Sequence, residues 1–211
     1  MKGIRFNSIH SFENLNLLLS VVDIPPAKPK TNFVDIPGGD GSVDLTEALG
    51  EVKFKDRECS FTFTAFPHED FEEKKKTVSN LLNGMRCRIE VDKDPGFYWE
   101  GRCSVNEYAS DKNLHQIVVG AVVAPYKLKN EQTVVTVPAG ESVKKTLENG
   151  RMTVVPTITN TANATIVFGG GTYTLNPGTH NLSSIVLKQG ENLVTVTSAS
   201  PVVFTYQEGE L

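Results

Sequence analysis

The stretch CSFTFTAF, residues 59–66, determines the fold class because its apolar residues recur at every second position. The apolar set is Cys59, Phe61, Phe63 and Ala65, and the polar set between them is Ser60, Thr62 and Thr64. Successive side chains of a strand point to opposite faces, so this period of two predicts a half-buried β-strand. Upstream, LNLLLSVVDI (15–24) places Leu15, Leu17, Leu19 and Val21 on one face in the same way.

Downstream of these strands, PHEDFEEKKKTVSNLLNGMR (67–86) predicts a single helix over about residues 68–83. Acidic residues occupy its first turns, Asn83-Gly84 supplies a stop, and an apolar stripe runs along one side. That stripe consists of Phe71, Val78, Leu81, Leu82 and Met85. Alternating runs follow in MRCRIEV (85–91), FYWEGRCSV (97–105) and HQIVVGAVVA (115–124). We therefore predict an N-terminal domain of strands around one helix, residues 1–126.

Residues 127–211 differ in character, with 14 threonines, no cysteine and no tryptophan. Short alternating runs separated by Gly, Pro or Asn recur in this part, among them TVVTVP (133–138), ATIVFGG (164–170), SIVLKQG (184–190) and PVVFTYQ (201–207). This spacing is typical of a small antiparallel β-sandwich. The sequence thus predicts a mainly β protein with a second domain at 127–211.

Composition and charge exclude several functions. Residues 1–126 carry 15 basic and 19 acidic side chains and residues 127–211 carry six of each, which disfavours a surface that grips nucleic acid. The histidines His10, His68, His115 and His180 are scattered, and no nucleophile or metal-binding motif is present. Three cysteines without CxxC spacing indicate reduced thiols. We predict no enzyme activity, no cofactor and no metal, although a composite site built from distant residues stays open.

The segment PPAKPKTNFVDIPGGDG (25–41) contains four prolines, which cannot donate to a central ladder, so we interpret it as an arm. The overlapping stretch DIPGGDGSVDLTEALG (35–50) lacks the G-x-G-x-x-G spacing of a phosphate loop. Asp40, Ser42, Asp44 and Glu51 match calcium-loop positions, but Leu45 stands where that loop needs glycine. We interpret the stretch as a tight turn and as a hinge between the arm and its domain.

Taken in order, several of these stretches resemble the distal tail (Dit) proteins of long-tailed bacteriophages. The resemblance lies in GIRFNSIHS (3–11), the proline-rich arm, IPGGDGSVDLTEALG (36–50), ECSFTFTAF (58–66), LLNGMRCRIEV (81–91) and DPGFYWEGRCSV (94–105), with a weaker match at GENLVTVTSASPVVFTY (190–206). The resemblance implies an N-terminal β-sandwich with one α-helix and a projecting arm, followed by a small C-terminal β-sandwich of jelly-roll or galectin type. It also implies a structural virion protein that forms a ring, usually a hexamer, at the distal end of the tail tube. That ring leaves a channel for DNA and attaches the receptor-binding proteins of the baseplate.

The resemblance further implies that the arm makes subunit contacts. The expected interface residues are Ile24, Pro25, Pro26, Pro29, Phe33, Val34, Ile36 and Asp40. The expected partners are the tail tube protein and other baseplate proteins, with DNA passing unbound and no insertion into a membrane. The N-terminus MKGIRFNSIHSFENL has no apolar core of a signal peptide, so synthesis in the host cytoplasm and a place in the virion tail tip are expected.

Two alternatives remain at this point. The first is a carbohydrate-binding sandwich that recognises host cell-wall glycan, for which stacking residues are needed. The available aromatic residues are Phe168, Tyr173, Phe204 and Tyr206. The second is a baseplate hydrolase, which requires converging acids or a triad in a cleft.

Overall fold

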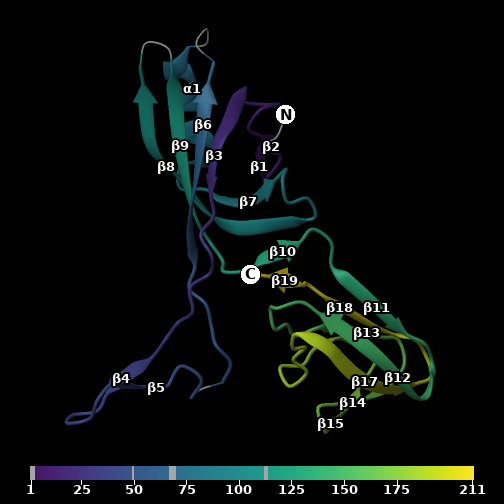
Figure 1. The fold of residues 1–211 in the computed structure, drawn as a ribbon. Helices are drawn as coiled ribbons and strands as arrows, with labels where there is room; N and C mark the ends of the chain where they lie inside the picture. The colour runs from purple at the N-terminus through teal and green to yellow at the C-terminus, as the bar shows by residue number, and fades with distance from the viewer. Residues whose placement is uncertain (1–2, 49, 67–69, 112–113) are drawn as a thin grey trace. The chain divides into compact units, whose positions relative to one another are not determined.

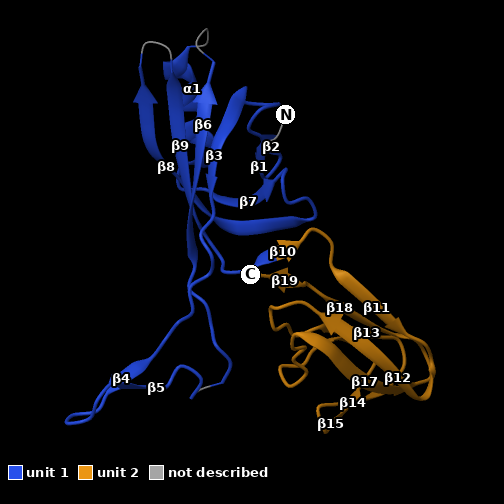
Figure 2. Cartoon of the chain, viewed as in Figure 1, with its two compact units in different colours: residues 1–127 blue, residues 128–211 orange. Residues whose placement is uncertain are grey.

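The computed structural model describes residues 3–48, 50–66, 70–111 and 114–211, and it divides the chain into two compact units, Met1–Lys127 and Leu128–Leu211 (Figure 2). The first unit contains β1 (Ile4–Phe6), β2 (Ile9–His10), β3 (Leu17–Asp23), β4 (Phe33–Asp35), β5 (Ser42–Asp44), β6 (Arg57–Ala65), α1 (Phe71–Leu82), β7 (Arg86–Val91), β8 (Phe97–Ser110) and β9 (His115–Val123), and β10 (Lys127–Lys129) begins at its last residue. The second unit contains β11 (Thr133–Val137), β12 (Gly140–Asn149), β13 (Thr157–Asn160), β14 (Ala164–Phe168), β15 (Gly171–Leu175), β16 (Gly178–Asn181), β17 (Gly190–Ser198), β18 (Val202–Tyr206) and β19 (Gly209–Glu210). The predicted mainly β fold with one helix is confirmed.

The sheet of the first unit encloses its own core. Its strands follow the order β2-β1-β7-β8-β9-β6-β3. Phe6 on β1 nevertheless packs edge-on against Phe61 and Phe63 on β6, with ring centroids 6.1 and 6.2 Å apart. Three strands separate β1 from β6 in the sheet order, so the contact requires the sheet to bend until its two ends face each other. The two layers of this sandwich therefore belong to one continuous sheet (Figure 1).

The alternation in CSFTFTAF is confirmed, because Cys59, Phe61, Phe63 and Ala65 are all buried. The prediction for Val21 was wrong, since this side chain is exposed. A bulge between Leu19 and Val21 shifts the register of β3 against β6 by one residue. An extra residue of this kind reverses the faces of everything beyond it, so Val22 packs against the core instead.

Helix α1 covers the sheet with Phe71, Val78 and Leu82. Asp70 is its N-cap and accepts hydrogen bonds from the backbone N–H groups of Glu72 and Glu73, which satisfies donors that the first turn leaves unpaired. The helix ends at Leu82, so the prediction that Met85 belongs to its buried stripe was wrong, and Met85 is exposed. The predicted helix start at His68 lies outside the described residues.

The second unit is a sandwich of two four-stranded sheets with the orders β11-β18-β13-β16 and β12-β17-β14-β15. Its core is filled from both sheets by Ile158 and Phe204 on one side and Ile166, Val194 and Val196 on the other. The sequence patterns missed one strand of this unit and predicted a strand at a segment that forms only a bridge. The long strand β12 was not predicted, because its lysines obscure the alternation, and SIVLKQG contributes only the isolated bridge of Leu187 to Val154.

Candidate functional site

The most unusual feature of the first unit is the arm, residues 24–56, which leaves the sheet after β3 and returns at β6 (Figure 1). At its root, the buried guanidinium of Arg57 donates from Nε to the carbonyl oxygen of Pro125 at 2.9 Å and from Nη1 to that of Pro25 at 3.4 Å. The ring of Phe54 packs edge-on against Tyr126, with centroids 5.9 Å apart. These contacts connect the base of the arm to the end of the main sheet.

Burial lowers the pKa of Arg57, because the charged form loses water, but arginine starts from a value so high that the side chain remains a cation. Its second terminal nitrogen, Nη2, is buried and has no hydrogen-bond partner in the structure. The cation therefore depends on the two carbonyl oxygens of Pro25 and Pro125 for its stabilisation.

We expect Arg57→Met to destabilise the fold, because both carbonyl oxygens lose their charged donor. The expected loss is about 1–3 kcal/mol of unfolding free energy, measured by chemical denaturation. Arg86→Met is the matched control, since Arg86 lies on the surface in an exposed pair with Glu100 at 3.1 Å. Equal midpoints for the two variants would contradict this role of Arg57.

The outer part of the arm is a two-stranded hairpin of β4 and β5 that forms a sheet of its own. Phe33 lies opposite Asp44, Val34 opposite Val43 and Asp35 opposite Ser42. Every residue from 28 to 45 is exposed, so no part of the unit that the structure describes covers the hairpin. A lone hairpin is at best marginally stable in water, which makes an uncovered one a candidate for binding a partner.

Five large apolar side chains are exposed on this hairpin and form what we call the apolar patch. They are Phe33, Val34, Ile36, Val43 and Leu45, with exposed fractions from 40% for Leu45 to 58% for Phe33. Exposed apolar residues are ordinary when they are scattered, but five of them within one short hairpin indicate an interaction site. In β4 and β5 the paired Val34 and Val43 lie on one face of the hairpin, and Phe33 lies on the other face, which it shares with Asp44 and the pair Asp35–Ser42.

The glycine-rich stretch forms the turn at the far end of the hairpin. Gly38 and Gly41 have φ angles of 79° and 75°, which other residues resist, so the chain reverses direction between β4 and β5 there. The expected hinge between arm and domain was therefore wrong in position. The predicted arm, Ile24 to Asp40, also omitted the return limb, because the pairing of β4 with β5 joins residues on both sides of the turn.

The acids near this turn are oriented by local hydrogen bonds. Ser42 Oγ donates to Asp35 at 2.6 Å, and Thr46 donates its backbone N–H to Asp44 at 2.9 Å. Hydrogen bonds from the side chain and backbone of Thr46 lower the pKa of Asp44, so this carboxylate stays ionised near neutral pH. No cluster of histidine, cysteine, aspartate or glutamate among the described residues is arranged to hold a metal ion.

The expected interface residues fall into two groups. Pro26, Pro29, Phe33, Val34, Ile36 and Asp40 are exposed along the arm. Ile24 and Pro25 are half-buried at the root, where Ile24 packs against the core of the main sheet. Sequence reasoning missed Val43 and Leu45, which join the same patch from the return limb; the alternation in SVDL was the available signal.

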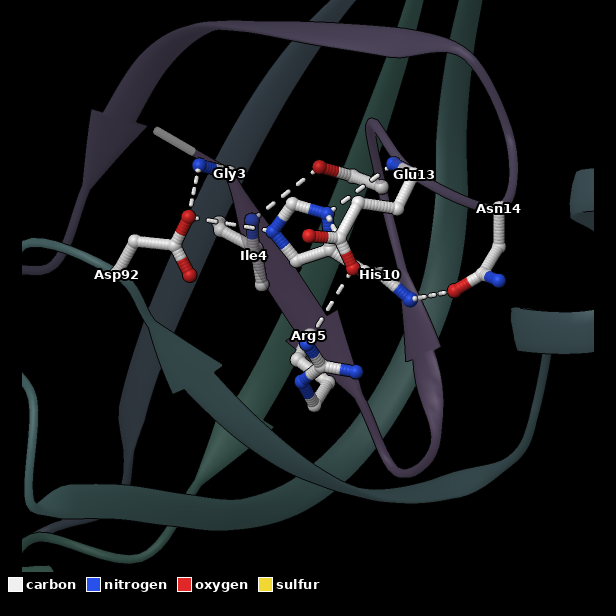
Figure 3. Close-up of polar contacts among 8 residues, drawn as sticks. Gly3, Ile4, Arg5, His10, Glu13, Asn14 and Asp92 are labelled. Carbon is white, nitrogen blue, oxygen red and sulfur yellow. Dashed lines mark hydrogen bonds and ion pairs between the residues drawn. The ribbon is translucent and has the colours of Figure 1, made fainter. Parts of the chain in front are cut away.

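The other candidate site is a polar cluster around His10, which is 2% exposed (Figure 3). The backbone N–H of Glu13 donates to its Nδ1 at 3.2 Å, which assigns the proton to Nε2. Nε2 lies 3.2 Å from Asp92 Oδ2, which also accepts the backbone N–H of Gly3 at 2.6 Å. The cluster joins β1, β2 and the end of β7.

This arrangement serves the fold. A Cβ at Gly3 would lie 2.6 Å from the His10 ring and 2.9 Å from Ser11 Oγ, so no space remains beside the ring for a substrate. Ser11 Oγ in turn accepts the backbone N–H of Ile4 at 3.2 Å. His115 packs on Phe71, His180 bonds to the Asn176 carbonyl oxygen, and His68 lies outside the described residues. The histidines that the structure describes therefore do not converge.

The cysteines are equally unsuited to chemistry. Cys59, Cys87 and Cys103 are free and buried, as expected. Burial raises the pKa of Cys59 to about 11 and also raises that of Cys103, so both thiols are protonated near neutral pH and are poor nucleophiles. Within the described part of the chain, no helix is sufficiently long and apolar to cross a bilayer.

The aromatic residues considered for stacking on sugars are mostly core residues. Phe204 and Tyr206 are buried, and burial raises the pKa of the Tyr206 hydroxyl to about 12. Phe168 and Tyr173 pack against the same core and are half-exposed. Glycan recognition usually needs flat, exposed rings, so this unit offers little support for the carbohydrate-binding alternative.

The fold and the arm together define a class: a mainly β protein of two units, the first with a bent sheet, one helix and an uncovered hairpin arm. No protein-family model and no curated protein matches the chain. Among solved structures, it is similar to the crystal structure of the SPP1 Dit protein, described as a paradigm of the hub adsorption apparatus in phages that infect Gram-positive bacteria. The TM-score is 0.75, the identity 14%, and the match covers 100% of both chains. The chain therefore has the fold of SPP1 Dit over its whole length.

Proposed function

We propose that this protein is a structural subunit of a phage tail that assembles into a ring, taken to be a hexamer, at the distal end of the tail tube. The observation that carries this proposal is the uncovered apolar patch of the arm on a fold shared in full with SPP1 Dit. The ring acts as a hub that binds the tail tube protein on one side and receptor-binding proteins on the other. Its place is the tip of the virion tail.

Self-association follows from the physical state of the arm. The apolar patch is not packed on the core formed by the described residues of its unit, and the hairpin is a sheet of two strands, so neither of its outer edges pairs with a further strand. Inserting each arm against the next copy removes the patch from water and pairs or covers those edges. Because the arm contacts a different surface of the neighbour, the interface is heterologous and closes into a ring when the rotation allows it.

The charge of the first unit suits a channel through which DNA passes. With 19 acidic and 15 basic side chains in residues 1–126, that part has a net charge of −4. A wall of this sign attracts few phosphates, so DNA can pass without being held. Specific binding of nucleic acid is no part of the proposal.

The direct test removes the arm while keeping its root. Residues 31–52 are replaced by Asn-Gly, a favoured two-residue hairpin turn that preserves the pairing of Pro29 with Phe54. Light scattering and negative-stain imaging should show rings for the unaltered chain and monomers for the shortened one. The fluorescence of Trp99, the single tryptophan, checks that the first unit still folds. An unchanged oligomer without the arm would refute the proposal.

A further inference from the structure

The stem of the arm carries four lysines on one face. An antiparallel bridge pairs Pro29 with Phe54, and the backbone bonds of Lys30 N to Lys53 O (2.7 Å) and Lys55 N to Lys28 O (2.8 Å) extend this pairing. Pro29 and Phe54 therefore share one face of the ladder. The alternation of side chains puts the lysines on the opposite face, with 28 across from 55 and 30 across from 53. We call Lys28, Lys30, Lys53 and Lys55 the lysine face.

Such an arrangement is unfavourable in an isolated chain, because like charges directly opposite each other in a ladder repel. All four lysines are exposed. Among the residues that the structure describes, no carboxylate forms an ion pair with any of them. The lysine face therefore concentrates four positive charges that no ion pair within the described residues neutralises, although Asp56 follows Lys55 in the chain.

The outer part of the same arm has the opposite charge. Residues 31–50 contain four acids and no basic residue. These acids, which we call the acidic tip, are Asp35, Asp40, Asp44 and Glu47, and all four are exposed. The charges of the arm are thus distributed unevenly along its length: residues 31–50 carry four negative charges, and the stem carries the four lysines together with Glu51 and Asp56.

From this uneven distribution we propose that the acidic tip of one copy docks on the lysine face of the next, so that the arms connect head to tail around the ring. The partner is a second copy of this chain, because the two surfaces are opposite in charge, carry four charged groups each and occur once each per copy. This inference rests on the proposed function and adds to it which part of one arm contacts which part of the next. The apolar patch supplies the buried area, and the charges select the direction and suppress tip-to-tip and stem-to-stem pairing.

Zero-length coupling tests the contact without any substitution. A carbodiimide joins carboxylates to amines only where the two groups touch, and mixing isotope-labelled with unlabelled full-length protein identifies links between copies by mass. We expect mixed-isotope peptides that link the acidic tip to the lysine face, and their yield should fall roughly tenfold when salt is raised from about 0.05 to 0.5 M. Coupling of the lysine face only to other carboxylates, or to none, would overturn the inference.

Charge exchange provides the second test. One variant carries Lys28, Lys30, Lys53 and Lys55 as glutamate, another carries Asp35, Asp40 and Asp44 as lysine, and a third carries both sets. Each single set should weaken self-association at least about tenfold, and the combined set should restore it, since the attraction is rebuilt with reversed sign. A variant with Lys144→Glu and Lys145→Glu in β12 serves as control for a change of net charge. Failure of the combined set to recover association would overturn the inference.

The outcomes also separate this inference from the proposal beneath it. If the chain without residues 31–52 still forms rings, the proposed role of the arm is wrong, and the docking inference falls with it. If that chain is monomeric while every charge variant assembles like the unaltered protein, the arm is the interface and its charges do not direct it. Trp99 fluorescence of each variant distinguishes lost docking from lost folding.

Discussion

Placing aspartate at Val34 and Val43 should abolish assembly of the ring without unfolding the protein. The two valines lie directly opposite each other at the centre of the apolar patch, and both are exposed in the single chain. In the proposed ring this patch is covered, so the substitutions would bury two unpaired carboxylates for every arm. An unpaired buried charge costs on the order of 3 kcal/mol or more, which corresponds to more than a hundredfold weaker association.

Light scattering across a concentration series measures this effect. Val134→Asp with Leu193→Asp is the matched control, because these side chains are at least as exposed as Val34 and Val43 and belong to the second unit. The control should keep the oligomer. Both double variants should also keep the midpoint of the unfolding transition monitored by Trp99 fluorescence, since no substituted side chain belongs to a core. Rings that survive the exchange of Val34 and Val43 would exclude the patch from the interface.

Gly101→Val should unfold the first unit or nearly so. Gly101 lies in β8 opposite Val123 of β9, where the two strands approach very closely. A Cβ at this position would collide with the carbonyl oxygen of Val122 and lie 2.6 Å from Cγ1 and 2.8 Å from Cα of Val123. Two of these three atoms are backbone, so the side chain fits only if β8 and β9 separate. We expect a loss of at least about 3 kcal/mol, a large share of the stability of a typical domain.

Denaturation monitored by Trp99 fluorescence tests this expectation, since Trp99 is two residues away on β8 and is buried. Gly39→Val is the control, because a Cβ there meets nothing closer than 3.6 Å and the residue lies in the turn of the arm. The control should unfold like the unaltered chain. If Gly101→Val also kept that midpoint, the close approach of β8 and β9 would not restrict this position.

The alternation of apolar and polar residues predicted which face of a strand is buried where the strand has no bulge. Cys59 to Ala65 alternate as expected, and so do Cys87, Ile89 and Val91 in β7. The prediction failed at Val21, because a bulge depends on how β3 meets β6 and leaves no mark in β3 alone. It also failed for Met85, since the helix ends at Leu82, with Asn83 as its C-cap, before it reaches this residue.

The residues of the candidate interface on the arm were likewise predicted only in part. Proline content marked an arm, and its apolar residues on the outgoing limb were recognised from sequence. Val43 and Leu45 were missed because they belong to the patch only through pairing with the outgoing limb. The His10 cluster was also out of reach, since Asp92 is 82 residues away along the chain.

The sequence by itself determined the class of fold, the helix, the arm and the uneven distribution of charge along it, because these depend on residue type and on spacing within a few positions. Only the tertiary structure decided that Lys28, Lys30, Lys53 and Lys55 share one face. Their common face depends on the pairing of Pro29 with Phe54, two residues joined by a long excursion of the chain. Register between distant segments is set by the whole set of cross-strand contacts, so a local pattern cannot specify it.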